Sequence, residues 1–201
     1  MIGKLLLAKT ERRAVSAGLA VQLPTGGDIT GQFDGNAFTI ENDAVIVSPF
    51  LAFVATPDSN RFYQGFAQAD FAAKGNTFSG LGKSTEFDGQ SLLRLSGGGG
   101  GRWFFRKNHG LLRGLAGLAE LHFTTTLEDS DSATLDNLNL NLASSQTLSN
   151  AAGHQSVLNL TSGLHLELPG KANARVGVNV ALRGGQHFHD ATLMVQVNLP
   201  L

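Results

Sequence analysis

Apolar and polar residues alternate with a period of two in the last quarter of the chain. Leucines occupy one parity, and small or polar residues such as Asn159, His165 and Glu167 occupy the other. The leucine positions are Leu158, Leu160, Leu164, Leu166 and Leu168. Because successive side chains of a strand point to opposite faces, the pattern predicts a strand with one apolar and one polar face.

The alternation returns twice after a turn at 169–173, first over 174–183 and then over 192–199. Each of these two-faced segments is about ten residues long, which is the length that a tilted strand needs to cross a bilayer. The same pattern suits a soluble antiparallel sheet with one face on a core. These three segments therefore predict strands without deciding between the two settings.

Six earlier segments also have the composition of strands, which gives a prediction of about nine strands. They cover 5–7, 15–23, 45–54, 62–71, 91–105 and 111–127, with the fifth interrupted by glycines at 97–101. The predicted connections alternate in length, being long after Leu23, Phe71 and Leu127 and short after Val54, Arg106 and Leu168. We expect a local hairpin near 34–36 and loops over 74–89 and 128–154.

Alternating long and short connections in an antiparallel meander are typical of outer-membrane β-barrels. Most acidic residues fall in the long connections, whereas Arg61, Lys107 and Lys171 lie at short ones. Bacterial single-chain barrels have even strand numbers, and residues 1–8 lack the long apolar stretch of a secretory signal. Our hypothesis is that an export signal and one or more further strands lie upstream of Met1.

Composition excludes several classes of function. The net charge is −1 and no basic patch interleaved with aromatic residues occurs, so nucleic acid is not an expected partner. Charged residues make up 15% of the chain, below the quarter that is usual in soluble domains. The absence of cysteine removes disulfides and thiolate metal sites. The sequence contains no run of about 18 apolar residues, so it predicts no transmembrane helix.

Several segments resemble a family of poorly characterised bacterial outer-membrane β-barrels, which are similar to transporter-like barrels associated with phenol degradation. The resemblance rests on five short motifs in order along the chain. They are Ala17-Gly18-Leu19-Ala20-Val21-Gln22-Leu23-Pro24-Thr25-Gly26, Ser48-Pro49-Phe50-Leu51-Ala52-Phe53 with Thr56-Pro57, Gln64-Gly65-Phe66-Ala67-Gln68-Ala69-Asp70, Glu120-Leu121-His122-Phe123-Thr124-Thr125-Thr126-Leu127 and Leu158-Asn159-Leu160-Thr161-Ser162-Gly163-Leu164-His165. The resemblance implies an outer-membrane location, passage of small molecules, and contact with the outer-membrane assembly machinery. It implies no catalytic residues.

Two motifs raise other chemistry. Residues 80–85, Gly-Leu-Gly-Lys-Ser-Thr, match the end of a phosphate-binding loop, but the motif also needs a glycine where Thr77 stands, and a helix after it. An outer loop is the better interpretation. His187 and His189 lie on one strand face at a spacing that can share a metal, and His165 is a distant third candidate. A solvated strand end is favoured over a metal site.

Polar residues on one parity of the predicted strands form the expected lumen lining. They are Gln64, Gln68, Asp70, Glu120, His122, Thr124, Asn159, His165, Glu167, Arg175, Asn179 and Arg183. The turn near Lys171 is expected to place Glu167 opposite Arg175 and Asn159 opposite Arg183. Glu120 and His122 could serve acid–base chemistry, but no nucleophile with an oriented base accompanies them.

We therefore predict a single all-β domain over 1–201, an antiparallel up-and-down transmembrane β-barrel of about 8–10 strands that further strands would complete. The expected role is a channel or uptake route for small solutes in the bacterial outer membrane, with the bilayer as partner and without enzymatic activity, cofactor or metal. The alternative is a soluble β-sandwich or barrel that acts as a binding or adhesion module. A β enzyme is the third hypothesis.

Overall fold

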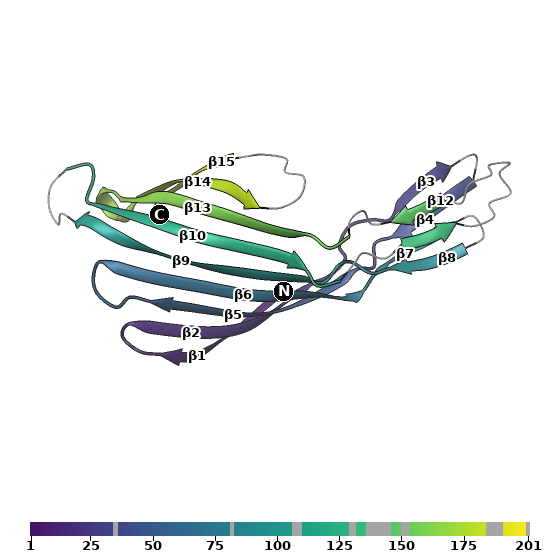
Figure 1. Cartoon of the computed structure of the whole chain (residues 1–201), viewed down its shortest axis with the longest axis horizontal. Helices are drawn as coiled ribbons and strands as arrows, with labels where there is room; N and C mark the ends of the chain where they lie inside the picture. Colours follow the sequence, from purple (N-terminus) through teal and green to yellow (C-terminus); the bar gives the residue numbers. More distant parts are fainter. Residues whose placement is uncertain are drawn as a thin grey trace.

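Nine strands of the protein form one antiparallel sheet in a computed structural model, which describes residues 1–33, 36–80, 83–105, 110–128, 132–135, 146–149, 153–183 and 191–199 (Figure 1). Each strand pairs with the strand that precedes or follows it in the sheet order, in antiparallel register. The strands are β1 (Ile2–Lys9), β2 (Arg13–Gln22), β5 (Val45–Ala55), β6 (Arg61–Lys74), β9 (Leu92–Phe105), β10 (Gly114–Thr126), β13 (Ser156–Glu167), β14 (Asn173–Arg183) and β15 (Ala191–Asn198).

The all-β class and the up-and-down order are confirmed, and a closed barrel is not seen. β1 and β15 occupy the two edges of the nine-stranded sheet, and no pairing joins them in the described residues. Among those residues the only helical element is a 3-10 turn at Pro169–Lys171. No helix in the described ranges is long and apolar enough to cross a membrane.

The long connections carry strands of their own. A second sheet has the order β3 (Ile29–Phe33), β4 (Asn36–Glu41), β7 (Asn76–Gly80) and β8 (Lys83–Phe87). β11 (Ser132–Leu135) pairs with β12 (Gln146–Ser149). The hairpin expected near 34–36 is confirmed by the β3–β4 pairing. The loop expected at 74–89 was wrong, because β7 and β8 form a hairpin there and β7 pairs with β4. The long connection expected at 128–154 contains the separate β11–β12 pair.

Short and long connections lie at opposite ends of the main sheet, as the sequence predicts. In Figure 1 the short connections lie at the left and the second sheet, which we call the tip sheet, extends from the right. Phe78 is the only buried apolar side chain among the described residues, at 4% exposure, and it belongs to the tip sheet. Its ring stacks on Phe38 at 5.9 Å and meets the edge of Phe87 at 6.4 Å. The nine-stranded sheet buries no apolar side chain in the described part of the chain.

The five glycines at 97–101 do not interrupt β9, which runs through them. Both flanking strands pair with this run, β6 on one side and β10 on the other. Its missing side chains leave room for aromatic rings of β6, because a Cβ on Gly100 would lie 2.5 Å from Phe62 Cζ and one on Gly99 would lie 2.8 Å from Tyr63 Cδ1. Phe62 and Tyr63 therefore cover the glycine run from opposite faces of the sheet.

Candidate functional site: a polar hollow on one face of the sheet

The predicted lumen residues share one face of the main sheet. Register places Gln64, Glu120 and Asn179 on one line across the strands, because each pairs with the next through Gly98 and Thr161. Parallel lines carry the others, with Gln68 and Thr124 flanking Arg94, and His122 paired with Asn159. Arg183 differs, because a bulge places it opposite Leu158 of β13.

A hollow of about 660 Å³ lies on this polar face, toward the short connections. Its lining runs from the β5–β6 turn and β6, across β9, β10, β13 and β14, to β15. Strands that are five places apart in the sheet thus line one space, so the sheet curls around its polar side. The predicted residues in the lining are Gln64, Glu120, His165, Glu167 and Arg175.

Side chains at the short-connection end of the hollow form a charged cluster. A terminal nitrogen of Arg102 donates to Glu167 Oε1 at 2.8 Å, and the Arg102 guanidinium lies 5.0 Å from the centre of the Phe105 ring. Arg175 Nε donates to His165 Nδ1 at 3.2 Å. The cluster therefore links β9, β13 and β14 across the floor of the hollow.

The predicted partners of Glu167 and Asn159 were wrong by two residues of register. Glu167 pairs with Asn173, and Asn159 with Ala181. The turn is tighter than expected, because Gly170 adopts φ 71°, the left-handed conformation that glycine takes without strain, and the Leu168 N–H donates to the Ala172 carbonyl at 2.9 Å.

Hydrogen bonds that are not ion pairs occupy the middle of the face. Gln64 Nε2 donates to Glu120 Oε2 at 2.9 Å, across Gly98. Asn179 Nδ2 donates to Thr161 Oγ1 at 2.8 Å, and the same hydroxyl oxygen lies 3.1 Å from His122 Nε2. Glu120 and His122 thus contact amide and hydroxyl groups, and neither meets a nucleophile held by an oriented base.

An ion pair stands at the opposite end of the polar face, near the long connections. Asp70 Oδ2 accepts from Arg94 Nε at 2.7 Å and its Oδ1 accepts from Gln68 Nε2 at 2.6 Å. Asp70 is only 6% exposed, which is possible for a carboxylate because both of its oxygens are hydrogen-bonded.

The other face of the sheet is apolar and uncovered. Some large apolar side chains on this side of the sheet, such as Leu160 and Phe123, are partly covered. Fifteen others are at least 36% exposed. They are Val15, Leu19, Leu51, Phe53, Tyr63, Phe71, Leu95, Leu121, Leu164, Val176, Val178, Val180, Leu193, Val195 and Val197. Each of these side chains exposes roughly 40 Å², about half of the area that burial of a valine or leucine removes from water. The exposed apolar area of the whole face therefore exceeds the few hundred Å² of the largest apolar patches usual in soluble monomers.

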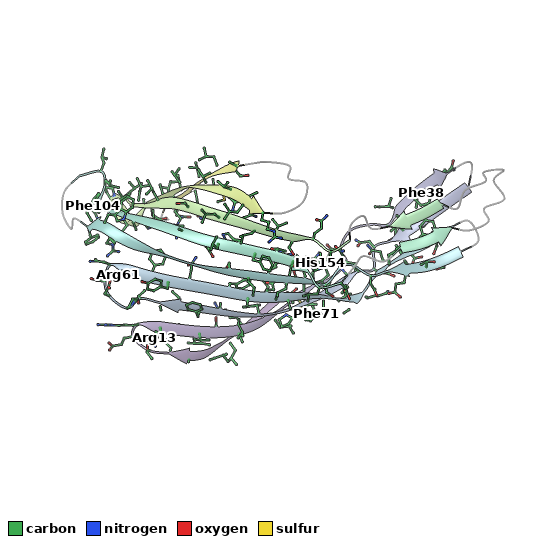
Figure 2. The ribbon with its side chains drawn as sticks, in the orientation of Figure 1. Arg13, Phe38, Arg61, Phe71, Phe104 and His154 are labelled. Carbon is green, nitrogen blue, oxygen red and sulfur yellow. The ribbon has the colours of Figure 1, made fainter. Side chains whose placement is uncertain are left out.

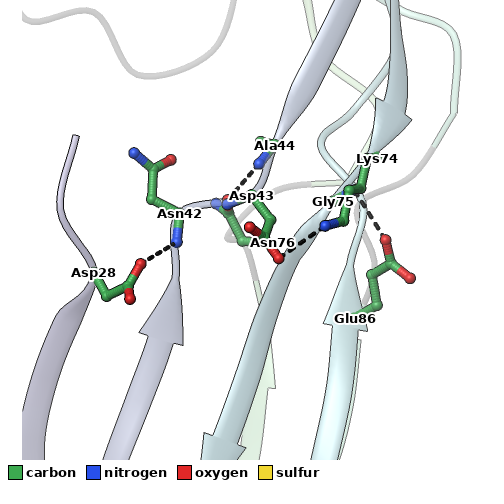
Figure 3. A network of polar contacts seen from close by, with 8 residues as sticks. All are labelled: Asp28, Asn42, Asp43, Ala44, Lys74, Gly75, Asn76 and Glu86. Atoms are coloured by element: carbon green, nitrogen blue, oxygen red, sulfur yellow. Dashed lines mark hydrogen bonds and ion pairs between the residues drawn. The ribbon is translucent and has the colours of Figure 1, made fainter. Parts of the chain in front are cut away.

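Polar contacts join the main sheet to the tip sheet (Figure 3), in the region where Figure 2 labels Phe71 and His154. Asn76 Oδ1 accepts from the backbone of Asp43 at 3.1 Å and of Ala44 at 3.0 Å. Lys74 Nζ lies 2.9 Å from Asp43 Oδ2. Beside this junction the Glu128 carboxylate accepts from the Ser91 N–H at 3.0 Å, and its hydrogen bonds with Ser91 lower its pKa.

The structure describes the segment that resembles a phosphate-binding loop but not the His187 and His189 pair. Gly80 pairs with Lys83 as β7 turns into β8, and β8 is a strand where a phosphate-binding loop needs a helix. His187 and His189 lie outside the described residues. Within the described ranges no group of three or more His, Asp or Glu side chains is placed to hold a metal ion.

Arg94 and Arg102 are functional candidates that the sequence analysis missed. Both lie on β9, where the glycine run hides the alternation that identified the polar parity of other strands. The available clue was the parity of the sequence numbers, since Arg94, Gly98 and Gly100 are all even-numbered positions of one strand and therefore belong to one face. Arg102 continues this register and pairs with Ala116, which pairs on its other side with His165.

Comparisons of the chain with protein-family models, with curated proteins and with solved structures find no match. The site must therefore be interpreted from its own geometry.

Proposed function

We propose that this sheet is the wall of a β-barrel in the bacterial outer membrane, which gives small solutes a route along its polar face. One observation carries the proposal: the apolar face is uncovered while the polar face is hollowed and lined by hydrogen-bonded charges. A soluble protein has the opposite arrangement, with apolar side chains inside. Acyl chains would cover the apolar face without any further protein layer.

Two further features support an outer-membrane setting. Short connections gather at one end of the sheet and long, strand-bearing connections at the other, which matches periplasmic turns and outer loops. Trp103 lies at the short-connection end, where its indole covers Gly117 on the apolar face, with a Cβ on that glycine 2.6 Å from Trp103 Cζ2. An exposed tryptophan at this end of the strands suits the interface between acyl chains and lipid headgroups.

The proposal requires a partner for each open edge. Unpaired backbone groups are costly in hydrocarbon, and membrane barrels avoid them by closing. β1 and β15 run in the same direction, because eight antiparallel pairings separate them. A ring with only antiparallel pairing therefore needs an odd number of additional strands between these two edges.

Reconstitution tests the proposal directly. The refolded chain is added to phospholipid vesicles and, in parallel, to buffer without lipid or detergent. We expect β-structure with heat-modifiable gel mobility only with lipid or detergent, and stepwise ion conductance in a planar bilayer once both edge strands are paired. A monomer that stays folded and soluble in plain buffer would contradict the proposal and favour the soluble binding module.

A further inference from the structure

The charged cluster at the short-connection end of the hollow contains more positive than negative charge. It holds two guanidinium groups, those of Arg102 and Arg175, and one carboxylate, that of Glu167. The carboxylate is engaged by Arg102 at 2.8 Å. Among the described residues no carboxylate oxygen lies within 4.0 Å of the Arg175 guanidinium.

The contact that Arg175 makes does not compensate its charge. His165 Nδ1 accepts a hydrogen bond from Arg175 Nε, so this ring nitrogen carries no proton and the imidazole is neutral. Across the sheet on the other side, Arg175 pairs with Gln196, which is also uncharged. Arg175 is thus an exposed cation between two neutral neighbours, with Glu167 nearby but paired to Arg102.

The free part of this guanidinium is suited to an oxyanion. Arginine has five N–H donors in a planar fork, and the contact with His165 uses the single donor on Nε. The four donors on the terminal nitrogens form the edge that binds carboxylate or phosphate oxygens in pairs. Arg175 lines the 660 Å³ hollow, which has room for a small solute beside this edge.

Two further carboxylates line the hollow, those of Asp58 and Glu120. Asp58 lies 3.9 Å from the Arg61 guanidinium, and Glu120, which has no cationic partner among the described residues, is too distant to neutralise Arg175. Ala116 lies level with His165 and Arg175, and Glu120 is four residues farther along β10. Four residues of strand span about 13 Å. That distance exceeds the screening length of about 8 Å at physiological ionic strength, so the positive end of the hollow keeps its character.

We propose that Arg175 forms an anion subsite, which binds the carboxylate or phosphate group of small solutes at the short-connection end of the hollow. The inference rests on the proposed function and adds the charge class of the solute. It places an attraction for anions at the end opposite the acidic long connections. Anionic solutes would therefore bind at the short-connection end, after they have passed the long connections, and the acidic long connections would not attract them.

Binding is tested on the full chain in maltoside micelles, which contain no phosphate. Sodium phosphate, and separately sodium acetate, is titrated at constant ionic strength while the arginine Nε–Hε signals are followed by NMR. Arg175→Gln removes the proposed subsite. Arg183→Gln is the matched control, because it removes the same charge from the same strand at a residue that does not line the hollow.

We expect saturable shifts of one arginine signal that are kept in Arg183→Gln and weakened about tenfold or more in Arg175→Gln, as loss of a charged hydrogen-bonding group predicts. Equal binding by all three proteins, or no saturable shift with either anion, would overturn the subsite. If a short-chain anionic phospholipid saturates the signal and inorganic phosphate does not, the ligand is a lipid headgroup and the solute subsite is also overturned.

Conductance separates the subsite from the proposed function. Reversal potentials are measured across a planar bilayer in a KCl gradient, and Arg175→Gln is expected to shift them toward cation selectivity whereas Arg183→Gln is not. Phosphate binding without any conductance would refute the solute route and leave the anion site standing. Conductance with unchanged selectivity and without phosphate binding would refute the anion site alone.

Discussion

Replacing Val178 by arginine tests which medium covers the apolar face. Val178 is the middle residue of β14, lies between Ser162 and Leu193 on that face, and is 40% exposed. If acyl chains cover this face, Val178→Arg should destabilise the fold by about 2–4 kcal/mol, the cost of a cation at the bilayer midplane. If water covers it, the change should stay within about 0.5 kcal/mol.

Leu182 supplies the control because it shares the parity of Val178 on the same strand and is 52% exposed. It lies four residues away, about 13 Å along the strand. With a strand tilt of about 45° this is about 9 Å of depth, close to the edge of an apolar band about 25 Å tall. Leu182→Arg should therefore cost only about 0–1 kcal/mol in a membrane.

Equilibrium unfolding in lipid vesicles measures both variants, with the fluorescence of Trp103, the only tryptophan, as the probe. The diagnostic quantity is the difference between the two variants rather than either value. A cost that falls with distance from the middle of the strand is specific to a bilayer. Equal costs at both positions, whether near zero or large, would refute the membrane assignment of this face, because neither water nor a packed protein layer has such a depth profile.

Two further predictions concern local contacts. Gly65→Ala should destabilise the fold by about 1–3 kcal/mol in the same unfolding assay, because the Phe53 ring occupies the space of the new methyl group, whereas Gly97→Ala, where no atom lies within 4 Å, should be far milder. Glu128, whose pKa is lowered by its hydrogen bonds with Ser91, should stabilise the fold above its ordinary pKa, and this contribution should disappear as the pH falls through the lowered value. A pH series in which Glu128→Gln and the parent lose stability in parallel would contradict the second prediction.

The alternation of side chains predicts much of the main sheet because each strand carries its own two-faced pattern. The segments from Val45 and Phe62 correspond to β5 and β6, and the three C-terminal segments to β13, β14 and β15. The prediction fails where pattern is absent or where partners are distant in sequence. The Gly97–Gly101 run has no pattern, yet two neighbours and overlying rings hold it extended.

Register and long-range contacts could not be predicted from single segments. The ion pair between Arg102 and Glu167 spans 65 residues, and it depends on the pairing of β9 with β10 and of β10 with β13. Only the β3–β4 hairpin of the tip sheet was expected, and the rest of that sheet was missed for a similar reason. Its strands are only five or six residues long and gain their stability by pairing across separate connections, as β4 does with β7.

The tip sheet supplies an internal comparison for the main sheet. In the tip sheet the chain does what a protein in water does, since Phe78 is buried between the rings of Phe38 and Phe87. In the main sheet of the same chain, valines and leucines of the apolar face stay uncovered, while small polar side chains such as Ser16 and Ser48 are 6% exposed on the other face. The tip sheet also exposes Ile29 of β3, at 62%, but it has a buried aromatic centre that the main sheet lacks. This difference fits the proposal that water surrounds the tip sheet and acyl chains cover the apolar face of the main sheet.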